Sequence, residues 1–165
     1  MSTAFTHTFS FAQVCAYATD KMLLSLGNII RDSDLPMETF TKYRSTYERG
    51  IKTWLLSGHF ELLMLEVYDP STERLIRRWD FDWSPDGNGE LGLWCNPEEI
   101  KYHLLKSGKI PSKCSYVIKV HTKPNEPAVD GWTKCDLRST SHLSQHSLGT
   151  TIGASSYRSR TSYWS

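Results

Sequence analysis

Two aspartates at alternate positions, Asp80 and Asp82, are the first residues in this sequence that could do chemistry. Carboxylate oxygens bind divalent cations, so the pair could hold a metal ion for hydrolysis. Such a site needs a third carboxylate, and none is obvious. The apolar residues Trp79, Phe81 and Trp83 instead predict a strand with one buried face and one wet face that carries the aspartates. We therefore expect no metal, and keep a small metal-dependent hydrolase using Asp80 and Asp82 as an alternative.

Two histidines, His142 and His146, lie four residues apart and could share a zinc ion if they stood on a helix. No third ligand is obvious, and the helix signal around them is weak. The four cysteines, Cys15, Cys95, Cys114 and Cys135, are far apart and form no C-x-x-C pair. We interpret them as reduced, mostly buried thiols.

The remaining chemical motifs give no catalytic residue and no cofactor site. The glycine-containing stretch 147–153 lacks the lysine of a phosphate-binding loop. Glu98 and Glu99 stand where acids stabilise the start of a helix. Because the titratable groups look dispersed, the sequence favours binding over catalysis.

Composition describes one ordinary globular domain, residues 1–165, with 39% hydrophobic residues and a net charge of +1. No basic stripe points to nucleic acid. No apolar run is long enough to span a bilayer, and the first residues lack the features of a signal peptide. We expect a cytoplasmic protein with neither membrane nor nucleic acid as a direct partner.

Three helices are predicted. The first follows a capping box formed by Ser10 and Gln13 and runs to about Ile30. The second follows Pro36 and ends at Gly58, and the third begins at Asn96 and ends at Gly108.

Strands are predicted at 60–68, 75–83, 115–122 and 132–138, with a flexible loop over 84–92. In the third strand Tyr116, Ile118 and Val120 share one face. Together with the helices, these strands predict an α+β fold in which helices pack on a mostly antiparallel sheet.

The two ends of the chain differ from this core, which we place at 10–138. Residues 1–9 precede a well-formed helix cap, so they can detach as an arm. Of the 27 residues in 139–165, 13 are serine or threonine, yet apolar anchors such as Leu148, Ile152 and Tyr157 are spread among them. A disordered tail would lack these anchors. We predict a mobile segment that packs in more than one way.

Several short stretches carry a resemblance to a known family. They are 18–23 (ATDKML), 48–55 (ERGIKTWL), 65–70 (LEVYDP), 78–82 (RWDFD), 122–124 (TKP), 136–140 (DLRST), 149–153 (GTTIG) and 162–164 (SYW). In this order the chain resembles the HORMA domain. More narrowly, it resembles the bacterial HORMA proteins encoded beside cGAS-like nucleotidyltransferases (CD-NTases) in CBASS anti-phage operons.

The resemblance implies a regulatory switch whose C-terminal safety belt wraps a closure-motif peptide added as a strand to the sheet. The closed form would bind and activate the CD-NTase, and a pachytene-checkpoint-type AAA+ ATPase would reopen it by pulling on the N-terminus. On this basis we assign the closure peptide to Ile118, Val120, Leu137, Leu148, Ile152 and Tyr157. We assign ATPase engagement to Ser2, Thr3, Ala4, Phe5 and Thr6. A structural oligomerisation module is the remaining alternative.

Overall fold

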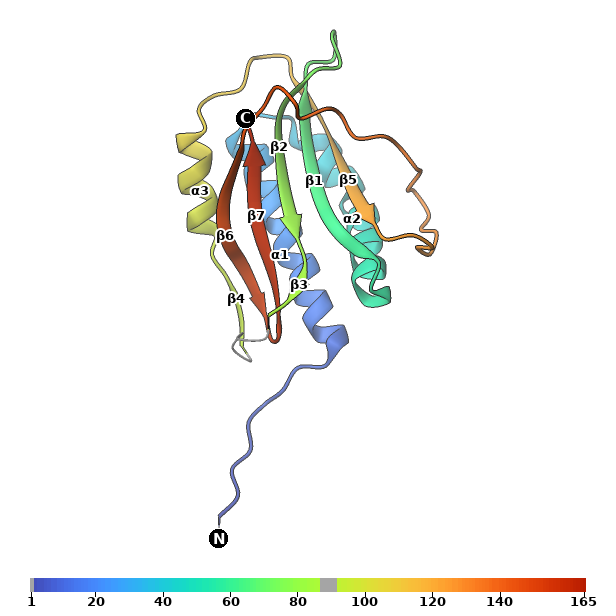
Figure 1. Ribbon diagram of the computed structural model, residues 1–165, viewed down its shortest axis with the longest axis vertical. Coiled ribbons are helices and arrows are strands. Elements are labelled where there is room, and N and C mark those ends of the chain that lie inside the picture. Colours follow the sequence, from blue (N-terminus) through green and yellow to red (C-terminus); the bar gives the residue numbers. More distant parts are fainter. Residues whose placement is uncertain (1, 87–91) are drawn as a thin grey trace.

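Helices cover one face of a single sheet in the computed structural model, which describes residues 2–86 and 92–165 (Figure 1). They are α1 (Phe11–Asp32), α2 (Met37–Ser57) and α3 (Pro97–Lys106). The expected caps form: the Ser10 side chain accepts from the Gln13 backbone N–H, and Gln13 reciprocates. Gly58 ends α2 with φ 77°, a left-handed conformation that glycine adopts without strain.

The described strands form one sheet in the order β4-β6-β7-β2-β1-β5, with β3 paired to β7. All these pairs are antiparallel, which confirms the predicted α+β architecture. The strands are β1 (Phe60–Tyr68), β2 (Leu75–Asp82), β3 (Ser84–Pro85), β4 (Leu93–Cys95), β5 (Ser115–Thr122), β6 (Gln145–Ala154) and β7 (Tyr157–Trp164).

Two of the strand and loop predictions need correction. Residues 132–138 form no strand. They form irregular contacts with three elements instead. Trp132 donates to the Thr46 backbone carbonyl of α2, and Arg138 donates to the Glu66 carboxylate of β1. The Asp136 carbonyl accepts from Lys119 of β5. Within the predicted loop 84–92, residues 84–85 form β3, and residues 87–91 lie outside the described part of the chain.

The hydrophobic core lies between the sheet and the helices, and it includes residues from the C-terminal strands. Ile152 of β6 is fully buried, and Tyr163 of β7 stacks on Trp79 of β2 with ring centroids 4.8 Å apart. Because β7 lies between β6 and β2, the hairpin β6–β7 completes the same core that the residues before 138 begin.

The N-terminal residues 2–8 are exposed and extend away from the domain before α1 begins (Figure 1). Phe5, a large apolar side chain, is 92% exposed in this arm. Among the described residues, no helix has both the length and the apolar character needed to cross a bilayer.

Candidate functional site

The two edges of the sheet differ in what they can offer a partner. One edge is β4, a strand of three residues, and the other is β5, a strand of eight. Within the described residues β5 pairs only with β1. Along an antiparallel strand every second residue directs its N–H and C=O away from its neighbour, so β5 presents a row of backbone donors and acceptors on its outer side.

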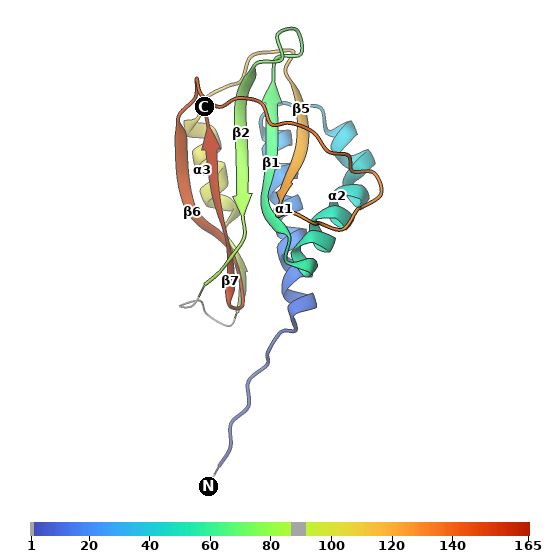
Figure 2. The ribbon, with the colours of Figure 1, turned by 45° about the vertical axis from the view of Figure 1, so that its right-hand side comes forward.

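An irregular segment, residues 123–144, connects the end of β5, at one edge of the sheet, to the start of β6, near the opposite edge. We call it the wrapping segment. Figures 1 and 2 show it leaving β5 near α2 and then crossing the face of the sheet that the helices leave open. It therefore passes around the outer edge of β5, and its two halves are held on opposite faces of the molecule.

The first half of the wrapping segment is held on α2 by two tryptophans. Trp132 packs edge-on against Trp54, with ring centroids 5.2 Å apart, and its indole N–H donates to the Thr46 carbonyl at 3.0 Å. Trp54 in turn donates to the Pro127 carbonyl at 2.9 Å. The indole of Trp132 lies directly over Gly50, where any Cβ would collide with it. A glycine inside α2 thus provides the room for this anchor.

The second half is held on the open face by a buried carboxylate, Glu66 of β1. Glu66 is fully buried and accepts from Lys119 Nζ at 2.7 Å and from Arg138 Nη1 at 2.7 Å. The backbone N–H of Arg138 also donates to Glu66, at 3.0 Å. We call Glu66, Lys119 and Arg138 the ionic latch. It stabilises the wrapping segment against β1 because an unpaired buried charge would be costly.

Further contacts of Arg138 and Lys119 stabilise the ionic latch. Arg138 pairs with Glu73 at 2.6 Å and lies 3.5 Å from the Tyr68 ring centroid, and Lys119 donates to the Asp136 carbonyl at 2.7 Å. Burial alone would raise the pKa of Glu66. The hydrogen bonds from Lys119 and Arg138 outweigh it and hold that pKa below its ordinary value.

The two aspartates of the 80–82 motif are each paired with an arginine. Asp80 is 4% exposed and forms a bidentate pair with Arg78 at 2.8 and 2.9 Å, and the Trp164 indole also donates to it. Asp82 is held by Arg160 at 2.8 Å. The prediction of a solvent-exposed face was wrong at Asp80, because the Arg78 guanidinium and the Trp164 indole, which stack on each other, both bond to its carboxylate.

Two other sequence interpretations also change. His142 contacts the Leu75 carbonyl at 2.7 Å, whereas His146 lies on β6 and stacks on Tyr163, so the two do not stand one helical turn apart. Of the cysteines, all free, only Cys15 is buried, and Cys135 is exposed in the wrapping segment. Among the described residues no cluster of three potential metal ligands occurs.

The six residues predicted to bind a closure peptide fall in three places. Ile118 and Val120 lie on β5 and pack toward the core, and Leu137 is 43% exposed in the wrapping segment. The other three, Leu148, Ile152 and Tyr157, belong to β6 and β7. Strands β2 and β1 separate that hairpin from β5, so the structure does not bring the six together.

The residues that anchor the wrapping segment were not among those predicted. Glu66 gave a signal, since it is the only acid between Leu62 and Tyr68 in an otherwise apolar strand. A lone acid in such a strand needs a buried partner. Its partner Arg138 lies 72 residues away, and no local pattern connects the two. The residues predicted to engage an ATPase, Ser2, Thr3, Ala4, Phe5 and Thr6, are all exposed in the arm.

Comparison with models of known families places the chain in one of them. The model of the family described as bacterial HORMA domain 2 matches residues 1–165. No curated protein is similar enough in sequence to count as a match.

Several solved structures share the fold at low sequence identity. A chain of a mitotic checkpoint complex is 12% identical, with a TM-score of 0.70 over 89% of this chain and 95% of that one. C. elegans HTP-1 bound to HTP-3 motif-1 is 7% identical, with a TM-score of 0.70 over 96% and 92%. A chain of the E. coli MS115-1 HORMA:CdnC:Trip13 complex is 13% identical, with a TM-score of 0.59 over 98% and 93%. The chain belongs to the bacterial HORMA domain 2 family.

Proposed function

We propose that this bacterial HORMA domain is a binding switch that captures an extended closure-motif peptide on the free edge of β5. The observation that carries the proposal is an eight-residue edge strand beside a segment anchored on both faces of the molecule. An extended peptide would add to β5 as a further strand and satisfy its outward N–H and C=O groups. Main-chain bonds would supply affinity, and side chains such as Leu137 would contribute to sequence preference.

The wrapping segment would retain the peptide after capture. It has to leave at least one of its two anchors before a peptide already in place can move off sideways. Affinity should therefore appear mainly as a slow off-rate. Within the larger predicted belt 139–165, we propose that residues 139–144 move with the wrapping segment. Leu148, Ile152 and Tyr157 would act indirectly, by holding the hairpin on β2 in the closed form.

The two proposed protein partners are the ones that the family resemblance implies. We propose that the peptide-bound, closed form binds and activates a CD-NTase of a CBASS anti-phage system. A pachytene-checkpoint-type AAA+ ATPase would then reset the switch by pulling on residues 2–6. The exposed, extended arm supports this because a pulling enzyme needs an unstructured handle, and Phe5 gives it a large side chain to grip. In this scheme the chain acts by binding and supplies no catalytic group.

The strand-addition step can be tested with a peptide selected by display against the full chain. A series of this peptide is made with one backbone N-methyl group at each position in turn. Because alternate residues of an added strand face β5, methylation should abolish capture at every second position and leave the others near the parent value. A loss that follows side-chain identity without this period of two would contradict strand addition.

The partner step needs a separate readout. CD-NTase activity is measured with the wild-type chain, with and without the selected peptide, and with the chain lacking residues 2–8. We expect activation only when peptide and chain are both present, and equal activation by the shortened chain. Activation that is independent of peptide would contradict the proposed switch.

A further inference from the structure

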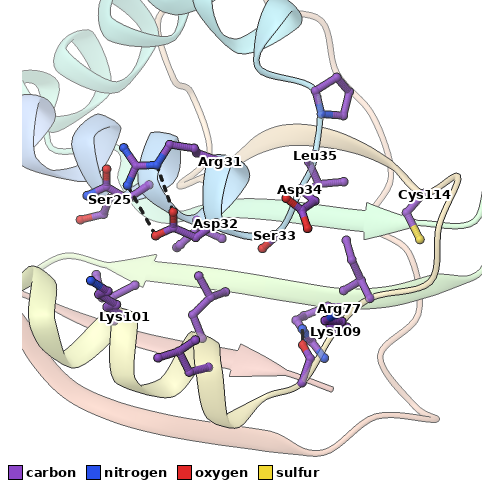
Figure 3. Close-up of a pocket in the computed structure, with 18 of the residues that line it drawn as sticks. Ser25, Arg31, Asp32, Ser33, Asp34, Leu35, Arg77, Lys101, Lys109 and Cys114 are labelled. Atoms are coloured by element: carbon purple, nitrogen blue, oxygen red, sulfur yellow. Dashed lines mark hydrogen bonds and ion pairs between the residues drawn. The ribbon is translucent and has the colours of Figure 1, made fainter.

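A cavity of about 1190 Å³ lies on the helix side of the sheet, apart from the peptide edge. It is bounded by the end of α1, the α1–α2 turn, α3 and residues 108–114, and none of its lining residues belongs to β5 or the wrapping segment (Figure 3). Small-molecule sites occupy roughly 300–1000 Å³. The cavity is therefore large enough for a small organic ligand.

Arg77 of β2 lies on the floor of this cavity, at a position where an apolar residue would be ordinary. It shares the inward face of β2 with Trp79 and Phe81, and it is only 7% exposed. Its two terminal nitrogens donate to the Ser107 and Gly108 carbonyls at 2.8 and 3.0 Å, while its Nε has no partner. Burial lowers the pKa of Arg77.

Among the described residues, no carboxylate pairs with Arg77. Its hydrogen bonds go to two neutral backbone carbonyls. These carbonyls end α3, where the helix dipole adds partial negative charge. These two hydrogen bonds show that Arg77 caps the C-terminal end of α3. They leave a buried unit charge only partly compensated, and a buried charge is normally paired.

The rest of the lining adds positive charge. Five basic side chains line the cavity against three carboxylates, and Arg31 already pairs with Asp32 at 3.0 Å. Within the described residues Lys101, Lys109 and Lys113 form no ion pair. Figure 3 places Arg77 and Lys109 at the same end of the cavity. Arg77 donates to the carbonyl of Gly108, the residue that precedes Lys109 in the chain.

Polar side chains such as Ser25, Asn28 and Ser112 also line the cavity, together with a set of apolar ones. The apolar ones are Ile29, Leu35, Ile100, Leu104, Leu105 and Ile110. A ligand with an anionic head and an apolar body would match both parts of the lining. Lysine and arginine bind carboxylates and phosphates, and the apolar walls would take the body from water.

We propose that this cavity binds a small organic anion, with its carboxylate or phosphate head at Arg77 and Lys109 and its body between α1 and α3. The site is independent of peptide capture. Occupation would complete the charge balance of Arg77 and tie the α1–α2 turn to α3.

Four probes test the proposal on the full chain by NMR titration: benzoate, phenyl phosphate, inorganic phosphate and neutral benzamide. We expect benzoate or phenyl phosphate to bind with a dissociation constant in the low millimolar range or tighter. A millimolar constant corresponds to a binding free energy of about 4 kcal/mol. Resonances of 29–35 and 100–110 should shift. The tighter of the two identifies the head group. Inorganic phosphate should bind at least about fivefold more weakly, since it lacks the apolar body.

Lys109→Ala should weaken the favoured anion by about fivefold or more, since hydrogen bonds to charged groups are the stronger ones. Lys42→Ala, an exposed lysine on α2 outside the cavity, should leave it unchanged. Arg77→Met should abolish binding if it folds, and Lys109→Ala carries the test if it does not. Equal binding of benzamide and benzoate, or anion binding indifferent to Lys109→Ala, would overturn the proposal.

Discussion

The chain that follows β5 consists of two stretches held by different forces. Residues 145–164 form a hairpin whose strands are bonded to each other and to β2, with Ile152 and Tyr163 in the core. The wrapping segment forms no strand. Its two ends, Lys123 and Ser144, bond to the backbone of His59 and Ser165, and between them it is held mainly by the side chains of Trp132 and Arg138. Strands joined by a backbone ladder open cooperatively, whereas a segment held by a few side-chain contacts can open locally. We therefore expect the wrapping segment to be the part that opens while the domain stays folded.

The largest effect should come from the hairpin. Ile152→Asp places a charge in the core and should lower the free energy of unfolding by about 4 kcal/mol or more, if the variant folds at all. Urea denaturation measures it. Leu137→Asp, in the wrapping segment and 43% exposed, is the matched control and should change stability by about 0.5 kcal/mol or less. Similar losses in both variants would remove the distinction between the two stretches.

The next effect concerns the α2 anchor. Gly50→Ala should displace Trp132, since the new Cβ collides with its indole, while alanine favours the helix by about 1 kcal/mol. We expect peptide dissociation to be faster by roughly tenfold, with thermal stability lowered little. Surface capture measures the rate. The control is Ser45→Ala, an exposed position on α2. An unchanged rate in Gly50→Ala, with Trp132 displaced, would show that this anchor does not retain the peptide.

The ionic latch should give a smaller, pH-dependent effect. The folded pKa of Glu66 is lowered, so the latch contributes fully above the ordinary glutamate value of 4.5 and is lost as pH falls toward the folded value. Hydrogen exchange of the Arg138 amide, which donates to Glu66, should accelerate below about pH 4.5 beyond the intrinsic pH trend. In Glu66→Gln this extra acceleration should disappear. If it persisted there, another group would control the release.

The smallest effect on the fold should follow loss of the arm. Deleting residues 2–8 removes exposed chain and leaves the Ser10 cap, so stability should change by about 0.5 kcal/mol or less. Peptide capture should be unchanged, while ATPase-driven release should stop. Release assays with the ATPase and labelled peptide compare the shortened and full chains. Normal release from the shortened chain would mean that the arm is not the handle.

Local chemistry in the sequence predicted the elements well. Three short-range signals appear as expected: the capping box at Ser10, the terminal glycine at Gly58 and the shared core-facing side of Tyr116, Ile118 and Val120 on β5. The apolar residues in 139–165 pack in a hairpin bonded to β2, and the prediction that this segment packs in more than one way stays a prediction. The path of the wrapping segment could not be predicted, because it depends on contacts between residues far apart in the sequence. Arg138 reaches Glu66 across 72 residues, and that contact replaces the predicted strand at 132–138.

Hydrogen exchange of β5 tests the central claim most directly. The full chain is measured with and without the selected peptide, and amide protection is resolved along 115–122 and along β4. We expect new protection at alternate β5 amides, slower exchange across the wrapping segment and no change at β4. Protection confined to β4, or a bound peptide that leaves every β5 amide unchanged, would contradict capture on this edge.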